Sequence, residues 1–166
     1  NGTLSSGGTA GTTILASLSG ATIGLGASSC GGTCGISLTT TELGNITAGS
    51  LTIGDGSNGN ITVEGGSSTD RDQFGTVTLN ATASASSVTF ETSNSTFQGL
   101  TVNAGNGITL SSNLTTNGTT GFNSDSDGNG TGDFSIFTAK TLNTTNNALS
   151  ECGCYYNSTV KPDRKL

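Results

Sequence analysis

Short triplets, in which serine or threonine stands between two apolar residues, recur along the chain and set its main pattern. Strand side chains alternate between two faces, so each triplet predicts a short β-strand with two buried apolar side chains and one exposed hydroxyl. Threonine suits the outward position because it is β-branched and tolerates water. The predicted strands are Ile36–Leu38, Leu51–Ile53, Ile61–Val63, Val77–Leu79, Val88–Phe90, Leu100–Val102, Ile108–Leu110 and Phe134–Ile136.

The spacing of these strands indicates a repeat. Between positions 51 and 108, every second triplet recurs after 20 to 27 residues. Short strands at such a period are typical of a β-solenoid, in which each turn of the chain stacks on the previous one. Segments rich in Gly, Asp and Asn, such as GDGSNGN at 54–60, would form the turns. We therefore expect an all-β solenoid of about seven coils, with a β-sandwich as the alternative.

The whole chain, residues 1–166, is expected to form one solenoid domain. No segment carries a convincing helical stripe of apolar residues. Residues 1–20 are interpreted as an N-terminal capping or junction segment. Residues 151–166, which contain two cysteines, are interpreted as a C-terminal cap and tail.

Composition argues against several functional classes. The chain has a net charge of −6 and no cluster of basic residues in its body, which argues against nucleic acid as a partner. Three basic residues in the last six positions form either a solvated terminus or a contact to an acidic neighbour: Lys161, Arg164 and Lys165. No apolar run is long enough to insert into a membrane. The chain has no histidine and none of the common catalytic motifs, so no catalytic residues are assigned and we expect no enzymatic activity.

N-glycosylation sequons are the most frequent motif. Ten occur where about five would be expected by chance from the composition. In those at Asn45, Asn60 and Asn113 the middle residue is Ile or Leu, so alternation would place the asparagine outward and the middle residue inward. N-linked glycans are therefore expected, although Asn and Thr are also ordinary turn residues of solenoids. The sequons begin at Asn1, Asn45, Asn60, Asn80, Asn94, Asn113, Asn117, Asn129, Asn143 and Asn157.

Four cysteines form two local pairs, Cys30 with Cys34 and Cys152 with Cys154. An even number of cysteines beside sequons favours disulfides in an oxidising compartment, and the spacing is a poor match to a zinc site. A disulfide between Cys152 and Cys154 would close a very small, strained ring. This favours disulfides from Cys152 and Cys154 to other cysteines. The three possible pairings remain open, and one hypothesis links Cys30 or Cys34 of one copy to Cys152 or Cys154 of the next.

Two clusters of charged residues are candidate sites. Asp125, Asp127 and Asp133 are candidate calcium ligands, but the run lacks the acidic residue that closes a calcium loop, so an Asp/Gly-rich corner is the preferred interpretation. The run 70–72, Asp-Arg-Asp, could suggest a polysaccharide-cleaving site, yet a solvated ion pair explains it more simply. No metal ion or other cofactor is expected.

The segments 88–97, 103–118, 125–136 and 139–150 resemble the repeats of secreted adhesin-type β-helical proteins. Such repeats occur in filamentous-haemagglutinin-like bacterial proteins and in long surface proteins of microalgae. The resemblance covers residues 76–150 and implies an extracellular right-handed parallel β-helix with a structural or adhesive role. The cysteines and the dense sequons resemble the eukaryotic members more closely, which suggests algal surface fibres as a setting.

The sequence thus predicts an extracellular, glycosylated structural subunit that stacks head to tail with copies of itself into a filament or cell-surface fibre. Other extracellular glycoproteins are a further expected class of partner. The alternative function is a binding module, either an adhesin or an ice-binding solenoid, because outward rows of threonine can order water.

Overall fold

The computed structural model describes residues 2–26, 34–65 and 73–152, and these are nearly all β-structure. Every pairing between the described strands is parallel. A β-sandwich of the immunoglobulin type is built from antiparallel sheets, so this pairing does not match the sandwich alternative. The all-β prediction is confirmed, and the strands form three parallel sheets.

The three sheets are called A, B and C. Sheet A has the order β1 (Leu4–Ile14), β4 (Ile46–Ile53), β6 (Thr76–Ala81), β9 (Leu100–Ala104), β12 (Thr120–Asn123) and β15 (Leu149–Cys152). Sheet B has the order β3 (Ile36–Leu38), β2 (Ile23–Gly26), β5 (Ile61–Glu64), β7 (Val88–Phe90), β10 (Ile108–Leu110) and β13 (Phe134–Ile136). Sheet C has the order β8 (Ser95–Phe97), β11 (Leu114–Thr116) and β14 (Leu142–Asn143).

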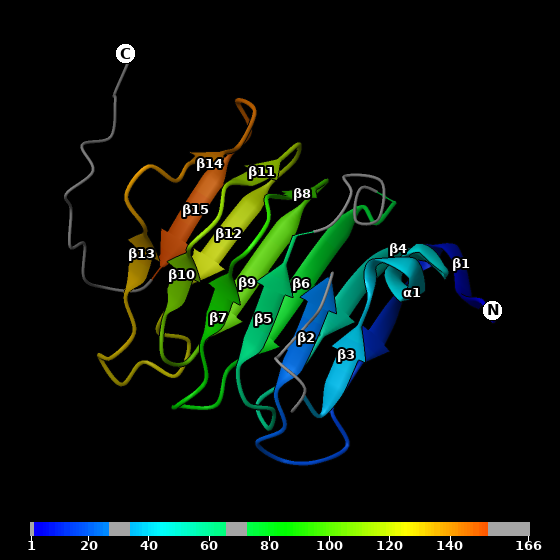
Figure 1. The fold of residues 1–166 in the computed structure, drawn as a ribbon, viewed down its shortest axis with the longest axis horizontal. Coiled ribbons are helices and arrows are strands. Elements are labelled where there is room, and N and C mark those ends of the chain that lie inside the picture. Colours follow the sequence, from blue (N-terminus) through cyan, green and yellow to red (C-terminus); the bar gives the residue numbers. More distant parts are fainter. Residues whose placement is uncertain (1, 27–33, 66–72, 153–166) are drawn as a thin grey trace.

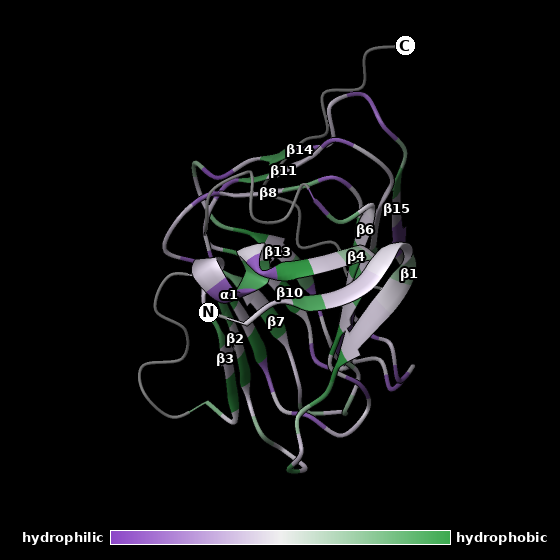
Figure 2. Ribbon diagram, turned by 90° about the vertical axis from the view of Figure 1, so that its right-hand side faces the viewer, coloured by the Kyte–Doolittle hydropathy of each residue, from purple (hydrophilic) through white to green (hydrophobic). Residues whose placement is uncertain are grey.

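The chain visits the sheets in turn. From β7 to β15 it passes through sheets B, C and A three times in succession, and each strand except β8, the first of sheet C, pairs with the strand one pass earlier. Figure 1 shows the passes lying side by side from the N-terminal end to the C-terminal end. Figure 2 shows the molecule from the N-terminal end, where the three sheets surround a common interior. Sheets A and B each hold six strands within the described residues.

All eight predicted triplets lie in strands, and their central hydroxyl residues face outward. In β7 and β10, for example, the flanking residues are fully buried while Thr89 and Thr109 are half-exposed. The buried apolar residues of the three sheets form one core, which includes an edge-to-face pair of Phe90 and Phe97 with ring centroids 6.3 Å apart. The pattern of the triplets therefore predicted both the strands and their buried faces.

The turn at 54–59, between β4 and β5, is held by its own polar side chains. The backbone N–H of Asp55 donates to Asn58 Oδ1 at 2.6 Å, and Ser57 N–H donates to Asp55 Oδ1 at 2.7 Å. Gly54 has a φ of +79°, a conformation that glycine adopts without strain. The Ser86 hydroxyl, one pass later, donates to the Asn58 carbonyl at 3.0 Å. The Gly/Asp/Asn-rich segment is thus a structural corner that also contacts its neighbour.

The N-terminal end departs from simple stacking. Strand β3 lies outside β2, so the order of these two strands in sheet B is reversed relative to the sequence. A short helix, α1 (Thr40–Gly44), follows β3 and contacts β2, β3 and β4, with Leu43 buried. Thr39 caps this helix in a capping box with Glu42. The helix lies on the third side of the molecule, where sheet C has no strand before β8.

Both predicted terminal segments contain strand. Residues 4–14 form β1, which pairs with β4, and β15 extends two residues into the segment interpreted as the C-terminal cap. Residues 153–166 lie outside the described part. Within that part, no helix is long and apolar enough to cross a membrane.

Candidate functional site

The sequon asparagines of the described residues are all accessible. Five of them are exposed, namely Asn60, Asn94, Asn117, Asn129 and Asn143, and three are half-buried, namely Asn45, Asn80 and Asn113. The middle residues Ile46, Ile61 and Leu114 are buried, as alternation predicts. Asn1 and Asn157 lie outside the described residues. The structure therefore leaves these eight side chains within reach of a modifying group.

Three of these asparagines connect successive passes of the chain by a hydrogen bond to the side-chain Oδ1 atom. Asn60 Oδ1 accepts the backbone N–H of Ser87 at 3.0 Å. Asn94 Oδ1 accepts that of Asn113 at 3.3 Å, and Asn113 Oδ1 in turn accepts that of Thr141 at 3.0 Å. None of the three Nδ2 atoms makes a hydrogen bond within the described residues. Because an N-linked glycan attaches to Nδ2 and leaves Oδ1 in place, these bridges and a glycan are compatible.

Two other sequon asparagines use their amides differently. Asn80 Oδ1 accepts a hydrogen bond from Asn103 Nδ2 at 2.8 Å, which forms a polar ladder on the outer face of sheet A. Asn129 Nδ2 donates to Asp127 Oδ2 at 2.7 Å. A glycan on Asn129 would compete for the nitrogen that holds its loop, so this sequon is a weaker candidate than those that bridge through Oδ1.

Threonine rows run along the outer faces. On sheet B, Thr62, Thr89 and Thr109 lie directly beside one another in register. On sheet A, a second row contains Thr52, Thr78 and Thr101. These rows are regular surfaces of small hydroxyl groups.

Large exposed apolar side chains gather at the two ends. Within the described residues, four of the five lie in or directly beside a terminal strand of sheet A or B, namely Leu4, Leu15, Phe137 and Leu149, and Leu18 lies in the turn between β1 and β2. The N-terminal end also holds a hollow of about 220 Å³ lined by Gly2, Leu4, Ile14, Leu38, Glu42, Asn45 and Ile46. The outward positions of the strands along the sides, in contrast, are mostly threonine, serine and asparagine.

Glu42 and Glu151, one near each end, have opposite electrostatic environments. At the N-terminal end, hydrogen bonds from the backbone N–H and the hydroxyl of Thr39 lower the pKa of Glu42. At the C-terminal end, Glu151 occupies the register position of the buried Phe122, and burial raises the pKa of Glu151. Glu42 therefore stays ionised more readily than an ordinary glutamate, and Glu151 less readily.

Replacing Glu151 with glutamine is expected to raise the midpoint of thermal unfolding at neutral pH. A raised folded-state pKa means that ionisation costs stability, so the wild type loses this contribution as the pH rises from the unfolded value through the folded one. The gain should stay below about 1 kcal/mol because water screens a largely exposed carboxylate. Melting curves of both proteins across the acidic range would show their difference growing with pH; a constant difference would contradict the assignment.

The cysteine prediction can be followed at one position. Cys34 is disulfide-bonded within the chain, which prevents it from bridging to a second copy at the same time. Cys30, Cys154 and the side chain of Cys152 lie outside the described residues, so their pairing stays a prediction. The same holds for the charged run 70–72 and for Lys161, Arg164 and Lys165.

The candidate calcium loop is held together internally. Asp125 accepts the backbone N–H groups of Asn129 and Gly130 at 3.1 and 3.0 Å, and Asp127 accepts that of Asn129 at 3.3 Å. Among the residues that the structure describes, no three acidic, histidine or cysteine side chains are grouped to hold a metal ion. The calcium prediction for Asp125, Asp127 and Asp133 gains no support from this geometry.

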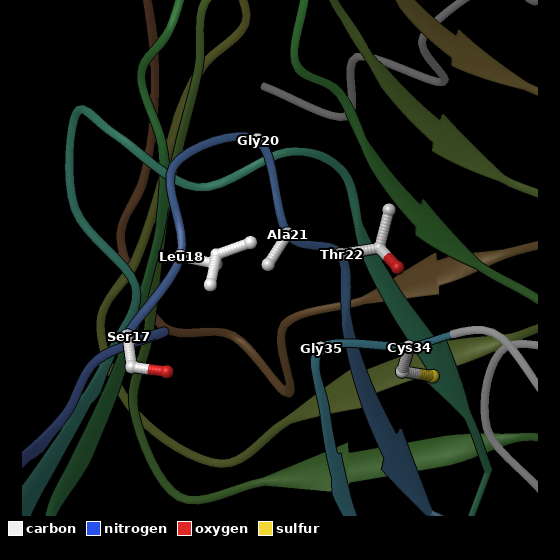
Figure 3. A pocket seen from close by; sticks show the side chains of 7 residues that line it. All are labelled: Ser17, Leu18, Gly20, Ala21, Thr22, Cys34 and Gly35. Carbon is white, nitrogen blue, oxygen red and sulfur yellow. The ribbon is translucent and has the colours of Figure 1, made fainter.

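Two open hollows lie beside the turns between sheets A and B. The first, of about 390 Å³, is lined by Ser17, Leu18, Gly20, Ala21, Thr22, Cys34 and Gly35 (Figure 3). The second, of about 430 Å³, is lined only by small neutral residues and Asn58 and Asn60. Apart from the disulfide-bonded Cys34, the described walls offer no titratable group that could serve as a general acid or base.

Sequence reasoning missed the charged residues of the two ends. The spacing of Thr39 and Glu42 is a capping-box signal that could have located α1. Lys140, the one basic side chain of the described residues, gives no motif or cluster signal because it stands alone in the sequence. Comparison with protein families, curated proteins and solved structures finds no match to this chain.

Proposed function

We propose that this chain is a glycosylated, extracellular structural subunit that assembles end to end into a filament or cell-surface fibre. The observation that carries the proposal is that four of the five exposed large apolar side chains of the described residues lie in or beside the terminal strands of sheets A and B. Strands β1 and β15 each have one neighbour in sheet A within the described residues, and such edges favour pairing with another chain. A contact between unlike ends that does not close on itself extends indefinitely.

The fold proposed for the subunit is a right-handed parallel β-helix of about seven coils. The cyclic passage of the chain through sheets B, C and A supports it, because each pass stacks on the previous one in register. Stacked coils form a stiff column whose stability comes from contacts between neighbours. A non-enzymatic, mechanical role follows from such a column.

N-linked glycans on the sides of the column would restrict association to its two ends. Asn60, Asn94 and Asn113 keep their coil-to-coil bonds when Nδ2 is modified, as described above. Bulky sugars there would hinder lateral association while leaving the ends accessible. N-glycosylation implies passage through a secretory pathway, which agrees with the disulfide at Cys34. The expected partners are copies of the chain itself and other extracellular glycoproteins.

Secreted, glycosylated chain should therefore form rods in negative-stain images, and its intact mass should exceed the 16.3 kDa of the polypeptide. Enzymatic removal of N-glycans should return the mass to that of the polypeptide, with one Asn converted to Asp at each occupied sequon. Single particles without rods at every concentration tested would refute end-to-end assembly. An unmodified mass would refute the glycan coat.

A binding module is the second candidate, and the threonine rows of sheets A and B favour it. Evenly spaced hydroxyl groups on a flat sheet are suited to ordering water or to adhesion. Glycans beside these faces would obstruct a flat ice surface. The same mass measurement therefore separates the candidates, because an unmodified, monomeric chain would favour the binding module.

A further inference from the structure

The turn after β13 presents an exposed apolar and an exposed basic side chain at the C-terminal end. It is fixed to the stack because the Phe137 N–H donates to the Leu110 carbonyl at 2.9 Å, and it closes through a bond of 3.0 Å from Lys140 N–H to the Phe137 carbonyl. The Phe137 side chain is nevertheless 56% exposed. Lys140 is exposed and has no carboxylate partner within the described residues.

The N-terminal end presents complementary features in the corresponding place. Strand β3 ends at Leu38, and Glu42 follows in the first turn of α1. Glu42 lies in the wall of the 220 Å³ hollow, which otherwise has mainly apolar side chains such as Leu4, Ile14 and Leu38. Its hydrogen bonds from Thr39 hold the carboxylate in place. An apolar recess therefore lies beside a fixed negative charge.

The register of sheet B relates these two places. Neighbouring strands of sheet B pair in parallel without offset, as β13, β10 and β7 do. If the terminal strand of one copy lies over that of the next in the same register, Ile136 lies level with Leu38. Lys140 and Glu42 each stand four residues beyond these positions. Lys140 and Glu42 would therefore both follow the same end of the stacked terminal strands of sheet B.

We propose that a contact between Lys140 of one copy and Glu42 of the next, beside Phe137 seated against the N-terminal hollow, specifies the junction between subunits. This inference rests on the proposed end-to-end assembly and identifies its contact. Like ends offer no such pairing, because a contact between two N-terminal ends would contain only the Glu42 carboxylates of this site, and one between two C-terminal ends only the Lys140 amines. Unlike ends bring opposite charges together, which fixes register and suppresses wrong contacts.

The sheet A side of the junction contributes differently. The shared register places Glu151 of one copy level with Ile14 of the next. A carboxylate beside an apolar side chain gives no attraction. The charge pairing that selects the partner end therefore belongs to the sheet B side.

Two charge-reversal variants of the full glycosylated chain provide the test, namely Lys140→Glu and Glu42→Lys. Each variant alone places like charges at every junction, so the concentration for half-maximal assembly in light scattering should rise about tenfold. Mixed in equal amounts, the two variants can alternate with opposite charges at every junction. The mixture should assemble at nearly the wild-type concentration.

Control variants guard against simple misfolding. Glu42→Gln removes the charge but keeps an acceptor for the capping box, and it should weaken assembly about two- to fivefold while circular dichroism stays unchanged. Glu91→Gln makes the same change of net charge in the middle of the stack and should leave assembly unaffected. The wild-type chain could assemble while the mixture of Lys140→Glu and Glu42→Lys needs a concentration as high as the two variants need separately. That result would contradict the proposed junction but not end-to-end assembly. If wild-type chain never assembles, both proposals fail.

Discussion

Replacing Phe90 with alanine is expected to destabilise the fold by about 3–5 kcal/mol, because a fully buried aromatic ring in a stacked core leaves a cavity when it is removed. Phe90 in β7 lies between Val63 and Leu110 of the neighbouring strands and packs edge to face against Phe97 of β8. One ring therefore joins sheet B to sheet C. For a chain of this length each kcal/mol corresponds to about 2–4 °C in the unfolding midpoint.

Thermal or urea unfolding of monomeric protein measures this effect. Phe137→Ala is a matched control, because the same atoms are removed from a side chain that is 56% exposed, and its effect should stay within about 0.5 kcal/mol. The double variant of Phe90 and Phe97 should show a coupling of about 0.5–1.5 kcal/mol for the aromatic pair. Equal losses at positions 90 and 137 would contradict the buried core.

Replacing Gly54 with alanine should destabilise the fold by about 2–4 kcal/mol. Two causes act at this position. Its φ of +79° is unfavourable for alanine, and an added Cβ would stand 2.3 Å from the Asn80 carbonyl oxygen of the next pass and 2.7 Å from Asn58 Oδ1. Since the backbone of the next pass cannot move without disturbing β6, the clash spreads beyond the turn.

Gly56 in the same turn provides the comparison. A Cβ there would meet only the Thr82 hydroxyl oxygen at 3.4 Å, and its φ lies outside the left-handed region. Gly56→Ala should therefore change stability by no more than about 0.5 kcal/mol. Parallel urea titrations of the two variants give the difference. Similar losses at both positions would show that flexibility of the turn, rather than the close approach of two passes, requires glycine.

Much of the fold could be predicted because the buried faces of the triplets are apolar. The strands β8, β11 and β12 were missed for a physical reason, since several of their inward residues are polar. Ser95, Thr116 and Thr120 are all buried, and the hydroxyls of Thr116 and Thr120 form a hydrogen bond with each other. A search for apolar alternation cannot recognise a strand whose inward residues are polar.

The sequence predicted which asparagines belong to the candidate site, but not the contacts that they make. The sequons locate the asparagines, and alternation explains why Ile61 and Leu114 are buried beside them. The hydrogen bond that the Thr141 N–H donates to Asn113 Oδ1 depends on which residues stack between passes, and a single repeat does not reveal this. Glu42 and Lys140 are far apart in the sequence and lie at opposite ends, so only the shared register of sheet B relates them.

The short extent of sheet C has a mechanical consequence for a fibre of the proposed kind. Sheets A and B have strands from the first pass to the last, whereas the strands of sheet C begin only at β8. Each subunit would therefore carry a zone in which one flank lacks a continuous ladder of backbone bonds. Such zones would recur once per subunit on the same side of the fibre. Because fewer backbone hydrogen bonds resist bending there, the fibre would bend more easily toward or away from that side than in other directions.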